Sequence, residues 1–234
     1  MNKQLVVAYK HELKGAYVVT SANSMIAALN YFLRMLDIPQ YRIKQFTVQK
    51  RMYCPEEKEL TKKEYSRLIK AARMADNRRL ELMMQTICAT GIRVSELKFI
   101  TVEAVEAGYT MVTCKRKSRT VFLPGKLRKL LKKYCYNDGM VNGPVFITHS
   151  GKAVDRNNIW REMKALCHKA NVSHRKVFPH NLRHLFARTF YRAEKDITKL
   201  ADILGHTNIS TTRIYIMESG AEHRKQIERL QLVL

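Results

Sequence analysis

Several absences exclude whole classes of protein. No run of about 18 uncharged apolar residues occurs, which excludes a membrane span. His11, Glu12 and Lys14 interrupt the apolar N-terminal stretch, so a signal peptide is not expected. The 5 cysteines lie far apart and form no C-x-x-C pair, which indicates neither a structural zinc site nor a disulfide framework. We therefore expect reduced thiols and a cytoplasmic location.

Acidic residues are the scarce charged type. The 234 residues include 20 Asp and Glu against 43 Lys and Arg, and the formal net charge is +23. Hydrophobic residues make up 46% of the chain, well above the content of a disordered basic tail. The composition therefore predicts a folded protein of one or two domains whose partner is an anionic polymer, with nucleic acid as the natural choice.

The apolar pattern predicts a mainly α chain with one small antiparallel β-sheet (α+β), organised in two parts. Residues 1–54 are expected to form a short helical segment, with a helix cap in 21–23 and a helix end before Pro39. Residues 49–59 are polar and are expected to form the linker. The second part, residues 55–234, is the larger domain.

Helix start and stop signals recur through this larger domain. A capping box at Thr61 starts one helix, and Gly91 ends the next one as a left-handed cap. Further helices are expected after a cap at Asn157, from Pro179 onward, and up to Gly205. Between these signals the chain is expected to fold as a helical domain around a single hairpin.

Basic residues cluster at that hairpin, whose strands are expected at 109–114 and 120–123. No acidic residue occurs between Glu106 and Asp138. Such a run is either a solvated face or a phosphate-contacting surface, and the β-branched strand residues within it favour the second interpretation. The basic residues of the run are Lys115, Arg116, Lys117, Arg119, Lys126, Arg128, Lys129, Lys132 and Lys133.

Four local patterns contain residue types suited to phosphate chemistry. They are Thr90-Gly-Ile-Arg-Val-Ser-Glu-Leu97, the hairpin lysine Lys115, His180-Asn-Leu-Arg183, and Leu204-Gly-His206 with Thr211-Thr-Arg-Ile-Tyr215 after it. The i, i+3 spacing places His180 and Arg183 on one face of a helix. Each pattern alone is weak, and their order and combination carry the information.

Each residue also has a plainer interpretation when it is taken alone. Arg93 beside Glu96 is consistent with a structural ion pair. His206 follows a helix-ending glycine, where it could compensate the helix dipole. Tyr215 is one of 11 tyrosines, and such a residue commonly packs half-buried.

Taken together, the patterns resemble the tyrosine recombinase (integrase) family over residues 56–220. The resemblance rests on an Arg, Lys, His-x-x-Arg, His and Tyr signature with the flanks T-G-I-R-V-S-E-L, P-H-N-L-R-H and L-G-H-T-N-I-S-T-T-R-I-Y. It implies the DNA breaking–rejoining catalytic domain of that family at 55–234. It also implies that 1–54 is a core-binding-like segment, either a minimal piece of a DNA clamp or a truncated one.

The resemblance implies a role for each signature residue. Arg93 and Arg183 would clamp the scissile phosphate, with Glu96 supporting the first arginine. His180 and His206 would line the phosphate, and Tyr215 would be the nucleophile. Lys115 would be the general acid by position, but this tip lacks the usual glycines and is one residue shorter, so Lys117 is the alternative. The surrounding DNA backbone would be contacted by Arg116, Lys117, Arg119, Lys126, Arg128 and Lys129.

These roles agree with the chemistry of phosphoryl transfer. Arginine forks neutralise the charge that develops on the non-bridging oxygens, in a bidentate geometry that lysine does not offer. Neighbouring cations make the phenol of Tyr215 easier to ionise. The phosphotyrosine link conserves the bond energy, so neither ATP nor a metal is needed. The sequence also contains no P-loop and no cluster of acidic metal ligands near these motifs. We therefore expect no cofactor.

The resemblance implies a site-specific recombinase or integrase that forms a 3′-phosphotyrosine intermediate and exchanges strands pairwise through a Holliday junction. Its role would be in a mobile element or Xer-like, and DNA inversion is an alternative. The expected partners are double-stranded DNA with inverted-repeat core sites and, on synapsed DNA, a homotetramer formed from free monomers or dimers. The bacterial cytoplasm or nucleoid is the expected location.

Two other functions and one structural alternative stay open from the sequence. A type IB topoisomerase would share the chemistry but relax DNA as a monomer. A basic DNA-binding protein could have kept the fold without activity. The last helix, expected near 221–233, either folds back on its own domain or is donated to a neighbouring protomer.

Overall fold

The chain divides into two compact units, Met1–Met52 and Tyr53–Leu234, in a computed structural model. The structure describes residues 2–47, 58–114, 117–148, 151–216, 224 and 227–231. The expected linker, 49–59, lies mostly outside these residues, and so does most of the expected final helix. Within the described ranges, no helix has both the length and the hydropathy needed to cross a membrane.

The N-terminal unit is a helical hairpin of α1 (Lys3–Ala16) and α2 (Val19–Met35), followed by a short 3₁₀ turn, η1 (Pro39–Tyr41). The expected cap at 21–23 is wrong, because α2 already begins at Val19. Asn23 instead exchanges two hydrogen bonds with the backbone of Phe46, at 2.9 and 2.8 Å. Asn30, on the same face of α2, does the same with Ile43. These amides hold the returning chain over a small core of Val6, Leu13, Ala22, Ile26, Leu33 and Ile43.

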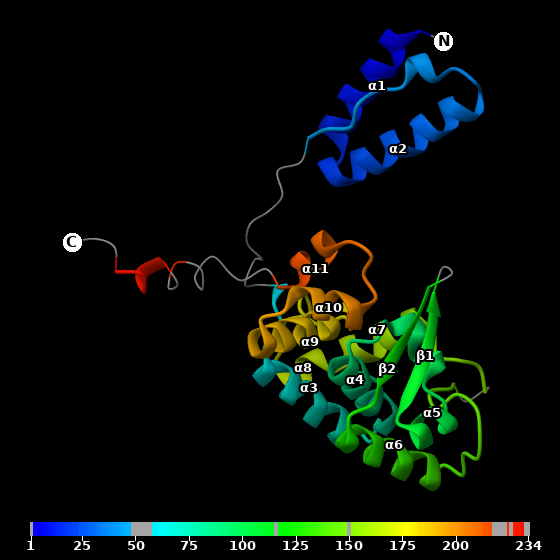
Figure 1. The fold of residues 1–234 in the computed structure, drawn as a ribbon, viewed down its shortest axis with the longest axis vertical. Coiled ribbons are helices and arrows are strands. Elements are labelled where there is room, and N and C mark those ends of the chain that lie inside the picture. The colour runs from blue at the N-terminus through cyan, green and yellow to red at the C-terminus, as the bar shows by residue number, and fades with distance from the viewer. Residues whose placement is uncertain are drawn as a thin grey trace. The chain divides into compact units, whose positions relative to one another are not determined.

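The larger unit is mainly helical with one two-stranded antiparallel sheet, as the sequence predicts (Figure 1). Its first half contains α3 (Lys62–Met74), α4 (Arg78–Thr90), η3 (Val94–Phe99), α5 (Val102–Ala107), β1 (Tyr109–Cys114) and β2 (Lys117–Phe122). Its second half contains α6 (Gly125–Asn137), α7 (Arg156–Ala165), α8 (Cys167–Ala170), α9 (Pro179–Glu194), α10 (Ile197–Leu204) and α11 (Ile209–Ile216).

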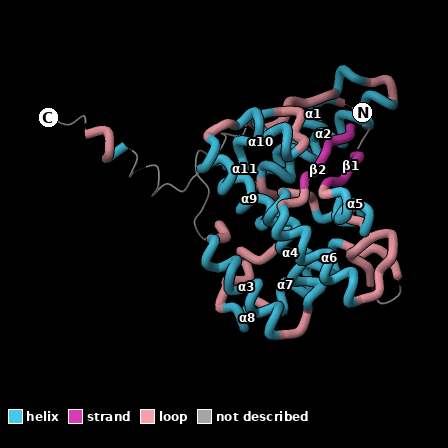
Figure 2. Tube along the Cα trace, turned by 60° about the horizontal axis from the view of Figure 1, so that its bottom comes forward, coloured by secondary structure: helices cyan, strands magenta, loops and turns pink. Residues whose placement is uncertain are grey.

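Helix α4 lies at the centre of this unit. It contacts α3, α6, α7 and α9 (Figure 2). Apolar residues cover most of its circumference, so it is buried on nearly all sides, as is typical of a central helix. The core residues that it supplies are Leu80, Leu82, Met83, Met84 and Ile87.

Several helix signals are confirmed. Thr61 and Glu64 form the reciprocal capping box at the start of α3, with hydrogen bonds of 2.8 and 3.2 Å. Gly91 ends α4 and Gly205 ends α10, each in the left-handed region with φ of 66°. Pro179 is the first residue of α9. Local sequence signals therefore predict the starts of α3 and α9 and the ends of α4 and α10.

Two boundaries differ from expectation. Asp155, and not Asn157, caps α7, because its carboxylate accepts hydrogen bonds from the backbone amides of Asn157 and Asn158 at 2.6 and 2.8 Å. Strand β2 begins at Lys117 and not at residue 120, since Cys114 pairs with Lys117 in the antiparallel register. Part of the basic segment expected at the hairpin tip is therefore strand.

Gly91 provides a test of this packing. A methyl group at Gly91 would lie 2.5 Å from Phe186 Cδ1 and would also meet the unfavourable positive φ. We expect Gly91→Ala to lower the free energy of unfolding by about 3 kcal/mol, the sum of left-handed strain and overpacking. Urea denaturation measures it. The matched control is Gly139→Ala, since Gly139 has φ of 62° but no neighbouring atom within 4 Å. Its loss should be only about 1 kcal/mol. Equal losses would show that Phe186 does not constrain this turn.

Candidate active site

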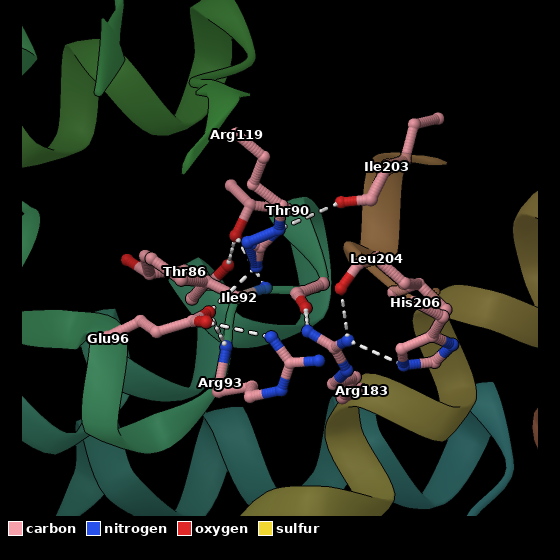
Figure 3. A network of polar contacts seen from close by, with 11 residues as sticks. Thr86, Thr90, Ile92, Arg93, Glu96, Arg119, Arg183, Ile203, Leu204 and His206 are labelled. Carbon is pink, nitrogen blue, oxygen red and sulfur yellow. Dashed lines mark hydrogen bonds and ion pairs between the residues drawn. The ribbon is translucent and has the colours of Figure 1, made fainter. Parts of the chain in front are cut away.

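Arg183, on α9, occupies the centre of the candidate site. Its side chain is 1% exposed. It donates hydrogen bonds to the carbonyl oxygens of Gly91 and Leu204, the latter at 2.7 Å, and contacts His206 Nε2 at 3.0 Å (Figure 3). The two carbonyls stand at the C-terminal ends of α4 and α10, where unpaired acceptors and negative dipole ends collect. One buried cation therefore satisfies the ends of two helices.

The guanidinium of Arg183 retains its charge and an unused donor. Burial and the nearby charge of Arg93 lower the pKa of Arg183 to about 10, so it is protonated at neutral pH. Its Nε is buried and has no hydrogen-bond partner among the described residues. Buried donors are nearly always paired in folded proteins, so an unpaired one suits a site that receives an acceptor from outside.

His206 follows Gly205 and is neutral. Arginine can only donate, so His206 Nε2 must accept the hydrogen bond from Arg183 and the ring proton must be on Nδ1. That nitrogen then donates to Thr212 Oγ1 at 3.0 Å. Burial and the charge of Arg183 lower the pKa of His206 to about 4. Because its ring is neutral, His206 cannot compensate the dipole of α10, so the dipole interpretation of His206 is not supported. The charge of Arg183, which binds the Leu204 carbonyl, compensates that dipole instead.

Glu96 is a buried carboxylate between two arginines. It contacts Arg93 Nη1 at 2.8 Å and Arg119 Nη2 at 2.7 Å, and it also accepts from the Arg93 amide at 2.8 Å. Arg119 further donates from Nε to the Ile203 carbonyl at 3.3 Å, which joins β2 to α10. The Arg93 side chain is 33% exposed, and its guanidinium lies beside that of Arg183 (Figure 3). Arg93 is therefore both ion-paired and accessible.

Tyr215, on α11, lies against α9. Its ring is 7% exposed, and its hydroxyl is 3.0 Å from His180 Nε2. The ring centroid lies 5.0 Å from that of His206 and 5.7 Å from Arg183 Cζ. His180 is exposed as a residue, so the site opens to solvent here. Partial desolvation of its ring and the charge of Arg183 lower the pKa of His180. The structure therefore brings His180, Arg183, His206 and Tyr215 together within one chain.

His184 is a member of this cluster that the sequence interpretation did not select. Its ring stacks on that of Tyr215, with the centroids 4.3 Å apart and the planes 21° from parallel. It stands one turn after His180, so helical spacing alone could have identified it. Burial and the charge of His180 lower the pKa of His184 to about 3.

The basic run divides into inward and outward residues. Lys115 and Arg116 lie outside the described residues, and Lys117 is described only as the first residue of β2. Lys126 and Lys129 are exposed on α6. Arg119 lies in the Glu96 network, and Arg128 Nε donates to the Val105 carbonyl at 2.7 Å. The expected DNA contacts of these two arginines stay predictions, and the structure gives both an internal role.

The arrangement combines an anion site with a nucleophile. Two guanidinium groups supply charge and donors, and a phenol stands within hydrogen-bonding distance of a neutral histidine. Within the described part of the chain, no group of three or more His, Cys, Asp or Glu side chains could hold a metal ion. Such a site is suited to a phosphodiester, whose oxygens take the donors while its phosphorus is attacked.

The low pKa values predict acid-sensitive stability. His184 and His206 titrate well below the usual value of 6.5 when folded, so the unfolded chain binds more protons as the pH falls. We expect the free energy of unfolding to decrease between pH 7 and pH 5, by roughly 1 kcal/mol for each buried histidine. Urea denaturation at the two pH values measures this change. His184→Phe should reduce the pH dependence by about one such contribution. An unaltered pH dependence in that variant would contradict the interpretation.

Comparison with known proteins gives one family. The family model described as the Phage integrase family matches residues 58–222. A tyrosine recombinase of Thermosipho africanus (strain TCF52B) is 29% identical over 231 residues, covering 90% of this chain and 76% of the relative. The crystal structure of XerA recombinase has a TM-score of 0.64 at 27% identity and covers 100% of this chain and 84% of its own.

A lambda integrase tetramer bound to a Holliday junction has a TM-score of 0.68 at 17% identity, covering 92% of this chain and 64% of its own, and so shows likeness of fold. The fold expected from the sequence, a tyrosine recombinase catalytic domain, is confirmed by these matches. Because the family match spans most of the chain and includes every described signature residue, the chain belongs to the phage integrase family and is a tyrosine-type site-specific DNA recombinase.

Proposed function

We propose that Tyr215 cleaves DNA by attacking a backbone phosphate and forming a 3′-phosphotyrosine link. The observation that carries this proposal is the 3.0 Å contact between the Tyr215 hydroxyl and His180 Nε2, beside the guanidinium of Arg183. All three residues come from one chain, so each protomer would attack with its own tyrosine. The exposed face of His180 gives the phosphate a route of approach.

Arg183 and Arg93 would hold the non-bridging oxygens of that phosphate. The partly exposed guanidinium of Arg93 is the donor directly open to it, and the unpaired Nε of Arg183, buried in the DNA-free protein, would be reached by a shift of the side chain on binding. Charge on these oxygens increases in the transition state, so fixed donors stabilise it more than the ground state. Glu96 fixes the Arg93 fork, and His206 fixes the Arg183 fork by accepting from Nη2. Removing one such phosphate contact typically slows the reaction by two to three orders of magnitude.

The proton of Tyr215 would pass to His180 as the bond to phosphorus forms. His180 is suited to accept it, because its lowered pKa leaves the ring neutral with a lone pair available. The bond from phosphorus to the 5′ oxygen breaks in the same step, and that oxygen takes a proton from a hairpin lysine. Lys115 is our choice for this general acid, with Lys117 as the alternative. Attack by the 5′ hydroxyl of the other strand reverses these steps and releases Tyr215.

The link between tyrosine and phosphate conserves the energy of the broken bond. Transesterification replaces one phosphodiester by another, so resealing needs no ATP. The arginines supply the charge that a metal ion supplies in other phosphoryl-transfer enzymes. We propose that the reaction uses no cofactor.

Double-stranded DNA with inverted-repeat core sites is the partner that we propose. The net charge of +23 and the exposed lysines of α6 favour a duplex, and the N-terminal segment would complete the clamp around it. The likeness to lambda integrase, seen as a tetramer on a Holliday junction, supports a homotetramer that exchanges strands pairwise. The free protein would be a monomer or dimer in the bacterial cytoplasm or nucleoid. A mobile-element or Xer-like role fits the matched relatives, with inversion as the alternative.

The nucleophile is tested by trapping. A nicked suicide substrate releases a short strand after cleavage, so a covalent protein–DNA adduct accumulates and is seen on a denaturing gel. Tyr215→Phe should form no adduct, because the attacking oxygen is missing. Tyr136→Phe is the matched control, since Tyr136 is 87% exposed on α6, and it should form as much adduct as the wild type. An adduct with Tyr215→Phe would assign the nucleophile elsewhere.

The exposed lysines of α6 are tested through salt dependence. Lys126 and Lys129 stand three residues apart on one helix face, and each contact with a phosphate releases about one counterion. We expect Lys126→Gln with Lys129→Gln to reduce the slope of log affinity against log salt by about 2. Gel-shift titrations between about 50 and 200 mM salt measure this slope.

Lys132→Gln is the control for the salt experiment. Lys132 lies on the same helix, but its ammonium already pairs with Glu106. Lys132→Gln should therefore reduce the slope of log affinity against log salt by less than one of the exposed lysines contributes. A double variant with the wild-type slope would remove α6 from the proposed duplex surface.

A further inference from the structure

Thr212 is a buried polar residue on the helix that carries the candidate nucleophile. It precedes Tyr215 by three residues, so both side chains lie on one face of α11. Thr212 is 0% exposed, whereas its neighbours Thr211 and Arg213 are exposed. A hydroxyl buried to this degree needs a hydrogen-bond partner. The partner that the structure provides is a residue of the site.

Thr212 ends a chain of hydrogen bonds that starts at the central arginine. Arg183 Nη2 lies 3.0 Å from His206 Nε2, and His206 Nδ1 lies 3.0 Å from Thr212 Oγ1. The chain joins three elements: α9, the turn after α10, and α11. The His206 ring therefore has a partner at each nitrogen, which fixes its orientation.

The direction of these bonds is determined by the arginine. Because its guanidinium has no acceptor, His206 Nε2 must be unprotonated, and Nδ1–H must donate to the hydroxyl. The other neutral tautomer would point an N–H at another N–H. A partner at Nδ1 commonly fixes the ring orientation of a functional histidine. Here that partner comes from the nucleophile helix itself.

We propose that Thr212 is a positioning residue of the recombinase site, which accepts the Nδ1–H of His206, fixes the orientation of that ring and thereby holds the fork of Arg183. The effect on cleavage rests on the proposed roles of Arg183 and Tyr215. The same bond seats α11, so that the nucleophile and the phosphate-binding arginine share one hydrogen-bonded chain. A threonine that only fills space would be replaced by valine without consequence for His206, since the two side chains have nearly the same shape.

The first experiment measures the tautomer directly in the DNA-free protein. Proton–nitrogen correlation spectra of protein labelled with ¹⁵N-histidine distinguish Nδ1–H from Nε2–H rings, and loss of one signal in His206→Gln assigns the residue. We expect Nδ1–H for His206 in the wild type and in Thr212→Ser, which keeps the hydroxyl. In Thr212→Val, Arg183 still requires Nδ1–H, but that proton has lost its acceptor, so we expect its signal to shift and to broaden through exchange with water. An unchanged Nδ1–H signal in Thr212→Val would overturn the proposal, and so would a changed signal in Thr212→Ser.

The second experiment measures the rate of adduct formation on the nicked substrate. Thr212→Val should be about tenfold slower, the effect of one lost hydrogen bond, while Thr212→Ser should stay close to the wild type. Thr211→Val is the matched control, since it makes the same change at the exposed neighbour, and its rate should be unchanged. Wild-type cleavage by Thr212→Val would overturn the positioning role.

The two experiments separate this inference from the proposed function. If the wild-type protein forms no adduct, the proposed nucleophile fails, while the tautomer spectra still decide whether Thr212 fixes His206. If Thr212→Val does not fold, as seen by circular dichroism, Thr212→Ser carries the test. A serine variant that folds but has lost the Nδ1–H signal or most of its cleavage rate would overturn the proposal.

Discussion

The burial of Arg183 is the interaction on which the rest of the site depends. An ionised guanidinium in a protein interior is costly unless most of its donors are satisfied, and in Arg183 only Nε is left unpaired within the described part of the chain. Here the acceptors are the carbonyls at the ends of α4 and α10 and one ring nitrogen of His206. Each helix has to end where it does for these carbonyls to point at Arg183, which is why both end at a glycine with positive φ. The positions of α4, α9 and α10 are therefore coupled through one side chain.

This arrangement produces a site that is strongly positive yet ordered. The histidines are neutral, because desolvation and neighbouring arginines oppose a further proton. The carboxylate of Glu96 offsets part of the charge and separates Arg93 from Arg119. The positive charge of Arg183, which has no carboxylate partner among the described residues, lies over the ring of Tyr215. A phosphate bound there would balance this charge. Electrostatics thus favour an anion at the position where chemistry requires one.

Local signals in the sequence predicted the parts of the fold that depend on short-range geometry. The capping box at Thr61, the glycine at the end of α4 and the proline that starts α9 are such cases. The cap expected at 21–23 failed because a side chain there has a distant partner. Asn23 suits a helix cap by type, but it bonds to Phe46 across the N-terminal unit. The start of α2 could not be derived from neighbouring residues alone.

The candidate site shows the same difference between features that local sequence signals predict and contacts that depend on distant residues. The signature residues were identified from type and order, and the structure brings those it describes to one place. Its basic neighbours predict a DNA-backbone contact for Arg119, which stays a prediction, and the fold adds a contact with Glu96 that the sequence does not indicate. His184 and Thr212 lie within the quoted motifs, but residue type and order alone assign them no role. Their importance comes from contacts that only the fold shows, His184 with the Tyr215 ring and Thr212 with His206. Charge composition identifies a partner, but only the fold shows which cations are internal.

The ion-paired triad of Arg93, Glu96 and Arg119 has a consequence for how the effects of substitutions at these positions combine. Losing the carboxylate alone would leave two neighbouring cations without their shared anion, and losing Arg119 alone would leave the carboxylate half-compensated. The effects of substitutions at these positions on stability are therefore non-additive. Replacing Glu96 and Arg119 together removes the anion and one of its cations at once, so the double change should cost less stability than the sum of the two single changes.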